Sequence, residues 1–204
     1  MTESSPRHRF SPTVLSTMAG MVVLVVAAAL VLLPRWLAQE PPSMAIGGPF
    51  SLVDHTGRTV TNADFHGKMM LIYFGYTYCP DVCPTTLGTM SQAYGQLTPS
   101  EQSRIVPIFV TVDPERDTVA QMAEYVGNFS PALVGLTGSP EQLGPVLKAY
   151  RVYARKAGGD SANYSVDHSS ILYLMDRDGK FDTNFPADLS VGDLLAGLKK
   201  RLAG

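Results

Sequence analysis

The chain has 204 residues, 17% of them charged, and a formal net charge of −2 at neutral pH. This length allows one domain of ordinary size with additional segments. The near-neutral charge argues against a nucleic-acid partner, because proteins of that class carry an excess of Lys and Arg to contact phosphates.

The N-terminal part contains a stretch of 25 residues without charge, at 10–34. Its apolar core is long enough to span a bilayer, since about 20 apolar residues cross a hydrocarbon layer. We therefore expect a cytoplasmic N-terminus at 1–12 and a single transmembrane helix at 13–34, with Arg7 and Arg9 on the cytoplasmic side. The alternative is a cleaved signal peptide, but this apolar run is longer than such peptides carry and no A-x-A-like site follows it. The expected location is a bacterial inner membrane, with the C-terminal domain in the periplasm.

Residues 35–48 are rich in Pro and Gly and predict a linker, and residues 49–204 predict one α/β domain. In this domain, runs typical of buried strands alternate with segments typical of helices. The expected strands are at 50–53 and 58–60, which form a hairpin, and at 68–74, 105–112, 133–136, 170–175 and 180–185. The expected helices follow Cys83, Thr118, Ser139 and Ser190. This order predicts a thioredoxin-like fold with an N-terminal hairpin, preceded by the single transmembrane helix.

Two cysteines lie where the expected strand at 68–74 gives way to a helix, in the segment YFGYTYCPDVCP. Open α/β sheets place their functional sites at this end of their strands. Cys83 is expected at the helix N-terminus, with Pro84 as the first helical residue, and the free N–H groups there favour a thiolate. If residues 79–83 form one helical turn, the sulfur atoms of Cys79 and Cys83 share a face. Such a pair predicts either a chelate for a soft metal ion or a redox-active disulfide.

The cysteine spacing favours metal binding. Cys-x-x-x-Cys is one residue longer than the redox motif Cys-x-x-Cys, and a structural disulfide that closes so short a loop would add little stability. Structural zinc usually has four protein ligands, whereas two sulfurs and one imidazole suit Cu(I). Of the four histidines, His168 is the best third ligand, because it precedes the strand at 170–175, beside the cysteine loop of thioredoxin-like folds. His8 precedes the expected anchor, and His55 and His66 are expected on the surface.

Three motifs together resemble the Sco/SenC family of cytochrome c oxidase assembly proteins: FGYTYCPDVCP, TVDPERDT and VDHSS. The resemblance covers residues 46–204. It implies a Cu(I) site formed by Cys79, Cys83 and His168, and a role in maturing the dinuclear copper centre of oxidase subunit II.

Two acidic residues are candidates for supporting these ligands. Asp113, in TVDPERDT, resembles the acidic residue that the family carries near the site, although capping of the next helix would also explain it. Asp167 could orient the histidine, as carboxylates that hydrogen-bond to metal ligands do, or be an ordinary loop acid.

The leading interpretation is a metallochaperone rather than an enzyme. Cu(I), with Cu(II) as a second state, would arrive from a periplasmic copper donor and pass by ligand exchange to oxidase subunit II. The alternative is a thiol–disulfide reductase that keeps the copper-site cysteines of the oxidase reduced. Both need Cys79 and Cys83, whereas only metal binding needs His168. A peroxidase or redox sensor is a third class, but the sequence before Cys79 lacks the Thr-x-x-Cys arrangement of such nucleophiles.

Overall fold

The computed structural model describes residues 21, 26, 29, 30, 46–159 and 163–203. The chain divides into two compact units, 1–44 and 45–204. The four described residues of the first unit are helical, and the rest of the expected anchor at 13–34 lies outside the described residues. No helix in the described part of the chain is both long and apolar enough to cross a membrane.

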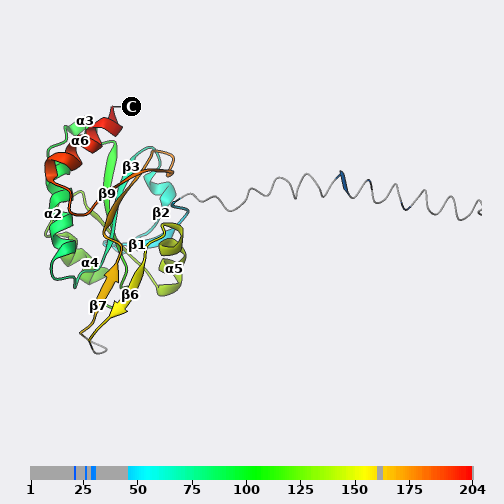
Figure 1. Cartoon of the computed structure of the whole chain (residues 1–204), viewed down its shortest axis with the longest axis horizontal. Coiled ribbons are helices and arrows are strands. Elements are labelled where there is room, and N and C mark those ends of the chain that lie inside the picture. The colour runs from blue at the N-terminus through cyan, green and yellow to red at the C-terminus, as the bar shows by residue number, and fades with distance from the viewer. Residues whose placement is uncertain (1–20, 22–25, 27–28, 31–45, 160–162, 204) are drawn as a thin grey trace, which may run out of the picture. The chain divides into compact units, whose positions relative to one another are not determined.

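The second unit is built on a seven-stranded sheet with the strand order β2-β1-β5-β4-β3-β8-β9 (Figure 1). The central strands β3, β4 and β5 are parallel to one another, and the outer strands pair antiparallel. The strands of this sheet are β1 (Ser51–Asp54), β2 (Thr59–Thr61), β3 (Met69–Gly75), β4 (Ile105–Thr111), β5 (Val134–Thr137), β8 (Ile171–Met175) and β9 (Phe181–Pro186). A separate two-stranded sheet contains β6 (Ala154–Ala157) and β7 (Ser165–His168).

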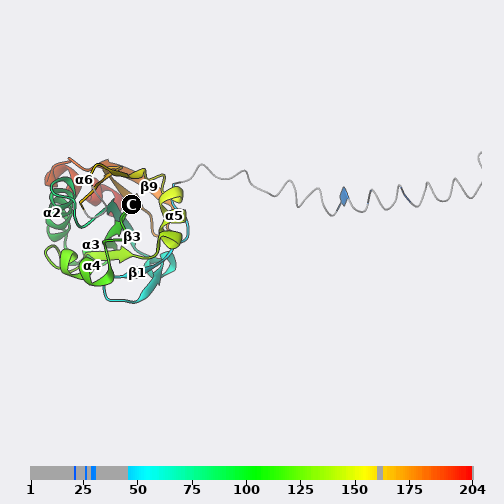
Figure 2. The same cartoon turned by 90° about the horizontal axis from the view of Figure 1, so that it is seen from below.

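Helices cover both faces of the large sheet. They are the 3-10 helix η1 (Asn62–Phe65), α2 (Val82–Gly95), α3 (Pro99–Gln102), α4 (Val119–Val126), α5 (Pro140–Ala149) and α6 (Val191–Leu202). Figures 1 and 2 show α2, α4 and α6 on one face and α5 on the other. Right-handed crossovers from β3 to β4 and from β4 to β5 explain why α2 and α4 share a face. The side chains of Thr118, Ser139 and Ser190 cap α4, α5 and α6 by accepting a backbone N–H.

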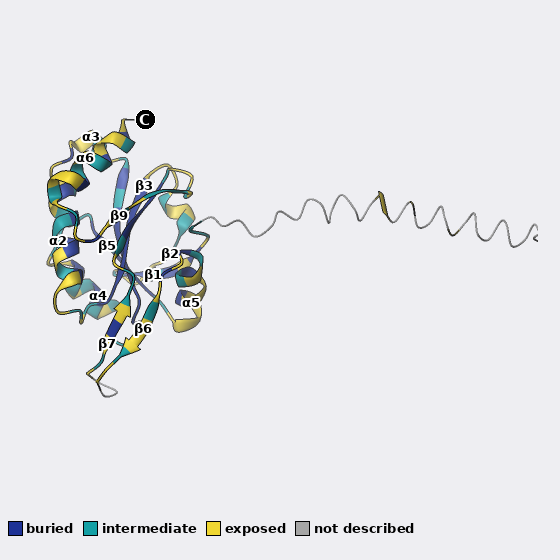
Figure 3. Ribbon diagram, in the orientation of Figure 1, coloured by how far each residue is buried: buried dark blue, intermediate teal, exposed yellow. Residues whose placement is uncertain are grey.

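The central strand β3 supplies the middle of the hydrophobic core. All seven of its residues are buried (Figure 3), because a strand covered by helices on both faces has no side that faces water. The ring of Phe74 packs against those of Tyr150 and Tyr173, with centroids 5.3 and 5.7 Å apart. The strand predicted at 68–74 is therefore confirmed to within one residue at each end.

The α-helix α3 and the strands β6 and β7 are absent from the sequence prediction. The β6–β7 hairpin projects from the end of the domain opposite the C-terminus of α6 (Figure 1). It has no apolar run that would reveal it, since β6 reads ARKA and β7 reads SVDH. His168 is consequently the last residue of a strand rather than part of a loop. The helix that carries Cys83 begins at Val82 instead of Pro84. Pro84 fits inside its first turn because the N–H groups of that turn have no intrahelical partner, so the missing N–H of proline costs no hydrogen bond.

Candidate metal centre

The site begins at the carboxyl end of β3, where Gly75 is followed by residues 76–81, here called the cysteine loop because they carry Cys79. Close packing requires glycine at position 75, since a Cβ there would lie 2.7 Å from Cys83 Sγ and 2.9 Å from the ring of Phe109. Helix α2 starts directly after the loop, with Cys83 in its first turn. The fold thus packs a thiol against the end of the central strand.

The structure brings Cys79, Cys83 and His168 together. Their ligand atoms all lie within 4.8 Å of one another. Cys83 Sγ is 3.4 Å from His168 Nε2, and the backbone N–H of Cys83 donates to Cys79 Sγ at 3.4 Å. Both cysteines are free thiols; Cys83 is buried, whereas Cys79 and His168 are half-buried. Folding therefore joins two segments of the chain into one set of sulfur and nitrogen donors.

The imidazole of His168 is held in one orientation. Its Nδ1 lies 3.1 Å from the carbonyl oxygen of Ser169, and a carbonyl can only accept. In the neutral ring Nδ1 therefore carries the proton, which leaves the lone pair of Nε2 directed toward Cys83. The rings of Tyr73 and Tyr76 meet the imidazole edge-on, with centroids 6.1 and 5.9 Å away. These contacts present Nε2 as a ligand atom.

The two thiols have opposite electrostatic environments. A hydrogen bond from the Cys83 side chain, together with one from the Cys83 backbone N–H, holds the pKa of Cys79 well below its ordinary value of 9.0. The same hydrogen bond and burial raise the pKa of Cys83. The Tyr73 hydroxyl donates to Cys83 Sγ at 3.9 Å. At neutral pH the site thus consists of a reachable thiolate beside a buried thiol, so that the proton of Cys83 must leave before both sulfurs can bind a cation.

A buried acid that the sequence analysis did not single out, Asp117, fixes the cysteine loop. Its carboxylate accepts hydrogen bonds from the Thr77 backbone N–H at 3.0 Å, the Thr77 hydroxyl at 2.7 Å and the Thr111 hydroxyl at 2.6 Å. Burial raises the pKa of Asp117. The only signal in the sequence was that TVDPERDT contains two aspartates; which of them turns toward the cysteine loop depends on the tertiary fold.

The two acids proposed to support the ligands have other contacts. Asp113 is buried and pairs with Arg116 Nε at 2.5 Å, while its other oxygen accepts from the Tyr164 hydroxyl at 2.7 Å. Helix α4 is capped by Thr118, not by Asp113. The carboxylate of Asp167 is 55% exposed and lies 3.8 Å from Arg155. The hydrogen-bond partner of His168 Nδ1 is thus a backbone carbonyl rather than the neighbouring acid.

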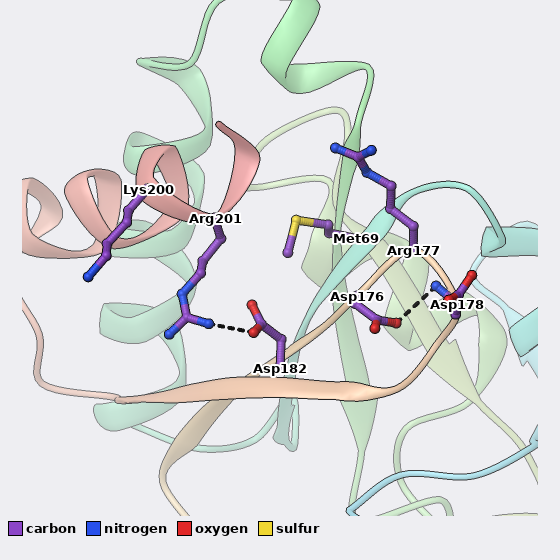
Figure 4. Close-up of a pocket in the computed structure, with 7 residues that line it drawn as sticks. All are labelled: Met69, Asp176, Arg177, Asp178, Asp182, Lys200 and Arg201. Atoms are coloured by element: carbon purple, nitrogen blue, oxygen red, sulfur yellow. Dashed lines mark hydrogen bonds and ion pairs between the residues drawn. The ribbon is translucent and has the colours of Figure 1, made fainter. Parts of the chain in front are cut away.

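His55 and His66, the other two histidines that the structure describes, do not belong to this group of ligands. His55 Nδ1 accepts a hydrogen bond from the Gly135 backbone N–H at 3.2 Å, and His66 is exposed. A charged pocket of about 340 Å³ is lined by Met69, Asp176, Arg177, Asp178, Asp182, Lys200 and Arg201 (Figure 4). Met69 is the first residue of β3, whereas the cysteine loop follows the last, so this pocket lies at the other end of the strand.

Comparisons with known proteins place this arrangement in a family. A family model described as SCO1/SenC matches residues 38–203. Protein SCO1 homolog 1, mitochondrial, of Arabidopsis thaliana is 43% identical over 167 residues, which are 80% of this chain and 50% of that protein. The structure of Bradyrhizobium japonicum ScoI with copper bound is 44% identical, with a TM-score of 0.71, and the match covers 76% of this chain and 99% of that one. For Arabidopsis thaliana ScoI with copper bound, the identity is 42%, the TM-score 0.72, and the coverage 78% and 99%.

These likenesses confirm the predicted mixed α/β, thioredoxin-like fold. The matched part spans 50%, 61% and 52% of the lengths of the curated relatives from Arabidopsis thaliana, Bos taurus and Homo sapiens. Because the family model matches most of the sequence and relatives over 40% identical cover three quarters of it or more, the chain belongs to the SCO1/SenC family.

Proposed function

We propose that this chain binds Cu(I) through Cys79, Cys83 and His168 and passes it as cargo to the dinuclear copper centre of cytochrome c oxidase subunit II. One observation carries the proposal: the ligand atoms of these residues lie within 4.8 Å of one another. Two sulfurs and one imidazole form a soft donor set of low coordination number, which Cu(I) prefers. Two relatives are described with copper bound, and the Sco family is described as one of cytochrome c oxidase assembly proteins.

Each ligand has its own part in this function. Cys79 is the reachable thiolate, so an incoming ion meets it first. Cys83 is buried and loses its proton when the ion binds, which makes cargo uptake release a proton. His168 adds a neutral nitrogen and leaves a coordination position open, through which a ligand of the acceptor enters. Transfer is then an exchange of ligands at the ion, with no change in its oxidation state.

We also propose where this exchange takes place. The uncharged run at 13–34 anchors the chain in a bacterial inner membrane, and the linker at 35–48 tethers the domain on the periplasmic side. A periplasmic donor supplies the copper there, and the copper-bearing domain of the oxidase is the acceptor. Cu(II) is a second state of the same cargo.

Metal analysis of the reduced full chain in detergent tests this function. We expect one Cu(I) per chain, with X-ray absorption showing two sulfur ligands and one nitrogen ligand. His168→Ala should remove the nitrogen and weaken binding by roughly tenfold or more, whereas His66→Ala, at an exposed position, should change neither. A wild-type protein that takes up no Cu(I), or a nitrogen ligand that survives in His168→Ala, would contradict the proposal.

Thiol–disulfide exchange is a second candidate, supported by the two adjacent free thiols. In this reaction the Cys79 thiolate attacks a partner disulfide, and Cys83 then displaces the partner's sulfur. Two electrons pass to the partner, which gains two thiols by taking one proton from Cys83 and one from solvent, while Cys79 and Cys83 form a disulfide. His168→Ala separates the functions, because a variant that loses copper but reduces a disulfide substrate at the wild-type rate would show that the thiols act without the metal.

A further inference from the structure

The hairpin that carries His168 is separate from the main sheet. Strands β6 and β7 form their own two-stranded sheet. A pocket of about 230 Å³ lies between the hairpin and the body, lined by Leu143 and Leu147 of α5 on one side and by Ala154 and Val166 of the hairpin on the other. Val166 reaches the hydrophobic core, but this pocket interrupts the packing beneath the hairpin, so the position of the hairpin also depends on specific polar contacts.

The strongest of these contacts converge on Arg116. Its Nε donates to Asp113 at 2.5 Å, and its Nη1 donates to the backbone carbonyl of Tyr164 at 3.0 Å. The guanidinium carbon also lies 3.7 Å from the centre of the Tyr164 ring, and the hydroxyl of that ring donates to the second oxygen of Asp113 at 2.7 Å. This closed network, here called the latch, consists of Asp113, Arg116 and Tyr164. It joins the segment between β4 and α4 to the residue just before β7.

Arg116 also reaches the cysteine loop. Its guanidinium lies 4.9 Å from the ring centre of Tyr78 and 5.7 Å from that of Tyr76. Within the described ranges Arg116 Nη2 has no hydrogen-bond acceptor, and the guanidinium interacts with these aromatic rings through cation–π contacts. The ring of Tyr76 meets that of His168 edge-on, with centroids 5.9 Å apart. One side chain therefore contacts both halves of the site.

We propose that Arg116 is a positioning residue: through the latch it holds β7 against the cysteine loop and so presents His168 Nε2 to the cargo ion. The identity of that ion rests on the proposed function, but the latch is defined by contacts of the metal-free chain. The side chains of Arg116 and Asp113 are 16% and 1% exposed. The other ion pairs of the hairpin, Lys156–Glu115 and Arg155–Asp167, are at least half exposed and hold it weakly.

Two latch variants and one control test this role. Tyr164→Phe keeps the ring over Arg116 and removes only the hydroxyl bond to Asp113. Arg116→Lys keeps the charge but loses the planar fork that bonds Asp113 and Tyr164 together. Arg155→Ala, the control, removes an exposed cation from the strand paired with β7. A competition assay with a chromogenic chelator measures Cu(I) affinity, and amide hydrogen exchange of the copper-free protein measures how often β7 opens.

We expect Tyr164→Phe to lower Cu(I) affinity about threefold and Arg116→Lys about tenfold, with β7 exchanging faster by similar factors while β3 is unchanged. In a His168→Ala background neither variant should lower the affinity further, because the latch acts only through the imidazole. An equal loss of affinity in that background, or unchanged exchange in β7, would overturn the proposal. If the wild type binds no Cu(I), the proposed function fails. The hydrogen-exchange measurement on the copper-free protein then tests by itself whether the latch holds β7 in place.

Discussion

Replacing Gly75 by alanine tests how closely the core supports the ligands. The added methyl would lie 2.7 Å from Cys83 Sγ and 2.9 Å from the ring of Phe109, whereas non-bonded heavy atoms prefer about 3.5–4 Å. The sulfur must therefore move by roughly 1 Å, and it starts 3.4 Å from His168 Nε2. Overpacking of this kind costs about 1–3 kcal/mol of unfolding free energy, and displacing a ligand should weaken Cu(I) binding by about tenfold.

Gly88→Ala is the matched control, because it makes the same chemical change inside α2, where the new methyl has no atom within 4 Å besides the adjacent residues and backbone of its own helix. It should stabilise the protein by about 0.5–1 kcal/mol through helix propensity and leave Cu(I) affinity unchanged. Urea unfolding of the reduced, metal-free protein measures the stability, and chelator competition measures the affinity. In a Cys83→Ala background the cost of Gly75→Ala should fall to what the Phe109 contact contributes. The reasoning is refuted if Gly75→Ala leaves stability and affinity at wild-type values.

Two further predictions concern the thiols and the cysteine loop. Iodoacetamide should label Cys79 at least tenfold faster than the buried Cys83. Because the pKa of Cys79 lies well below 9.0, the rate at Cys79 should stay nearly flat from about pH 6 to 8. Mass spectrometry of the reduced protein measures both rates, and a Cys79 rate that rises tenfold per pH unit would contradict the prediction. Asp117→Asn should lower the free energy of unfolding by about 1–3 kcal/mol, because an amide offers one acceptor oxygen to three donors. Asp188→Asn, at an exposed position, is the control in the same urea titration. Equal stabilities of the two variants would contradict the role of Asp117 in fixing the cysteine loop.

The sequence was informative where a local pattern determines structure. The strand β3 is an apolar run because both of its faces are covered, and the caps of α4, α5 and α6 are visible as Thr or Ser before each helix. The β6–β7 hairpin shows no such pattern. Its place is set by Arg116 and Tyr164, which are 48 residues apart in the chain, and contacts at that separation leave no periodic signal in either segment.

The candidate site was predictable to the same extent. Cys79 and Cys83 are close in sequence, so a helical turn is enough to bring them together. His168 could be chosen once a thioredoxin-like fold was predicted, because that fold places the start of the strand at 170–175 beside the cysteine loop. The roles of the supporting acids could not be predicted in this way, because the role of a carboxylate depends on its hydrogen-bond partners in the folded chain. Asp113 and Asp117 occur in one short motif, yet one binds Arg116 and the other binds Thr77. Composition and spacing do not distinguish them; the direction in which each side chain leaves the turn after β4 does.

The division of the ligands between two segments bears on how cargo would leave the proposed copper site. Cys83 is fixed by α2 and the end of β3, so moving it means disturbing the core, as Gly75 illustrates. His168 lies on a hairpin with a pocket beneath it and a small network at its edge. The imidazole is therefore easier to withdraw than the buried sulfur of Cys83, and Cys79 is the reachable sulfur at which an acceptor must make its first contact. Transfer in this order would loosen the nitrogen first, exchange Cys79 second and release the buried sulfur last, so that the ion is never without a thiolate ligand.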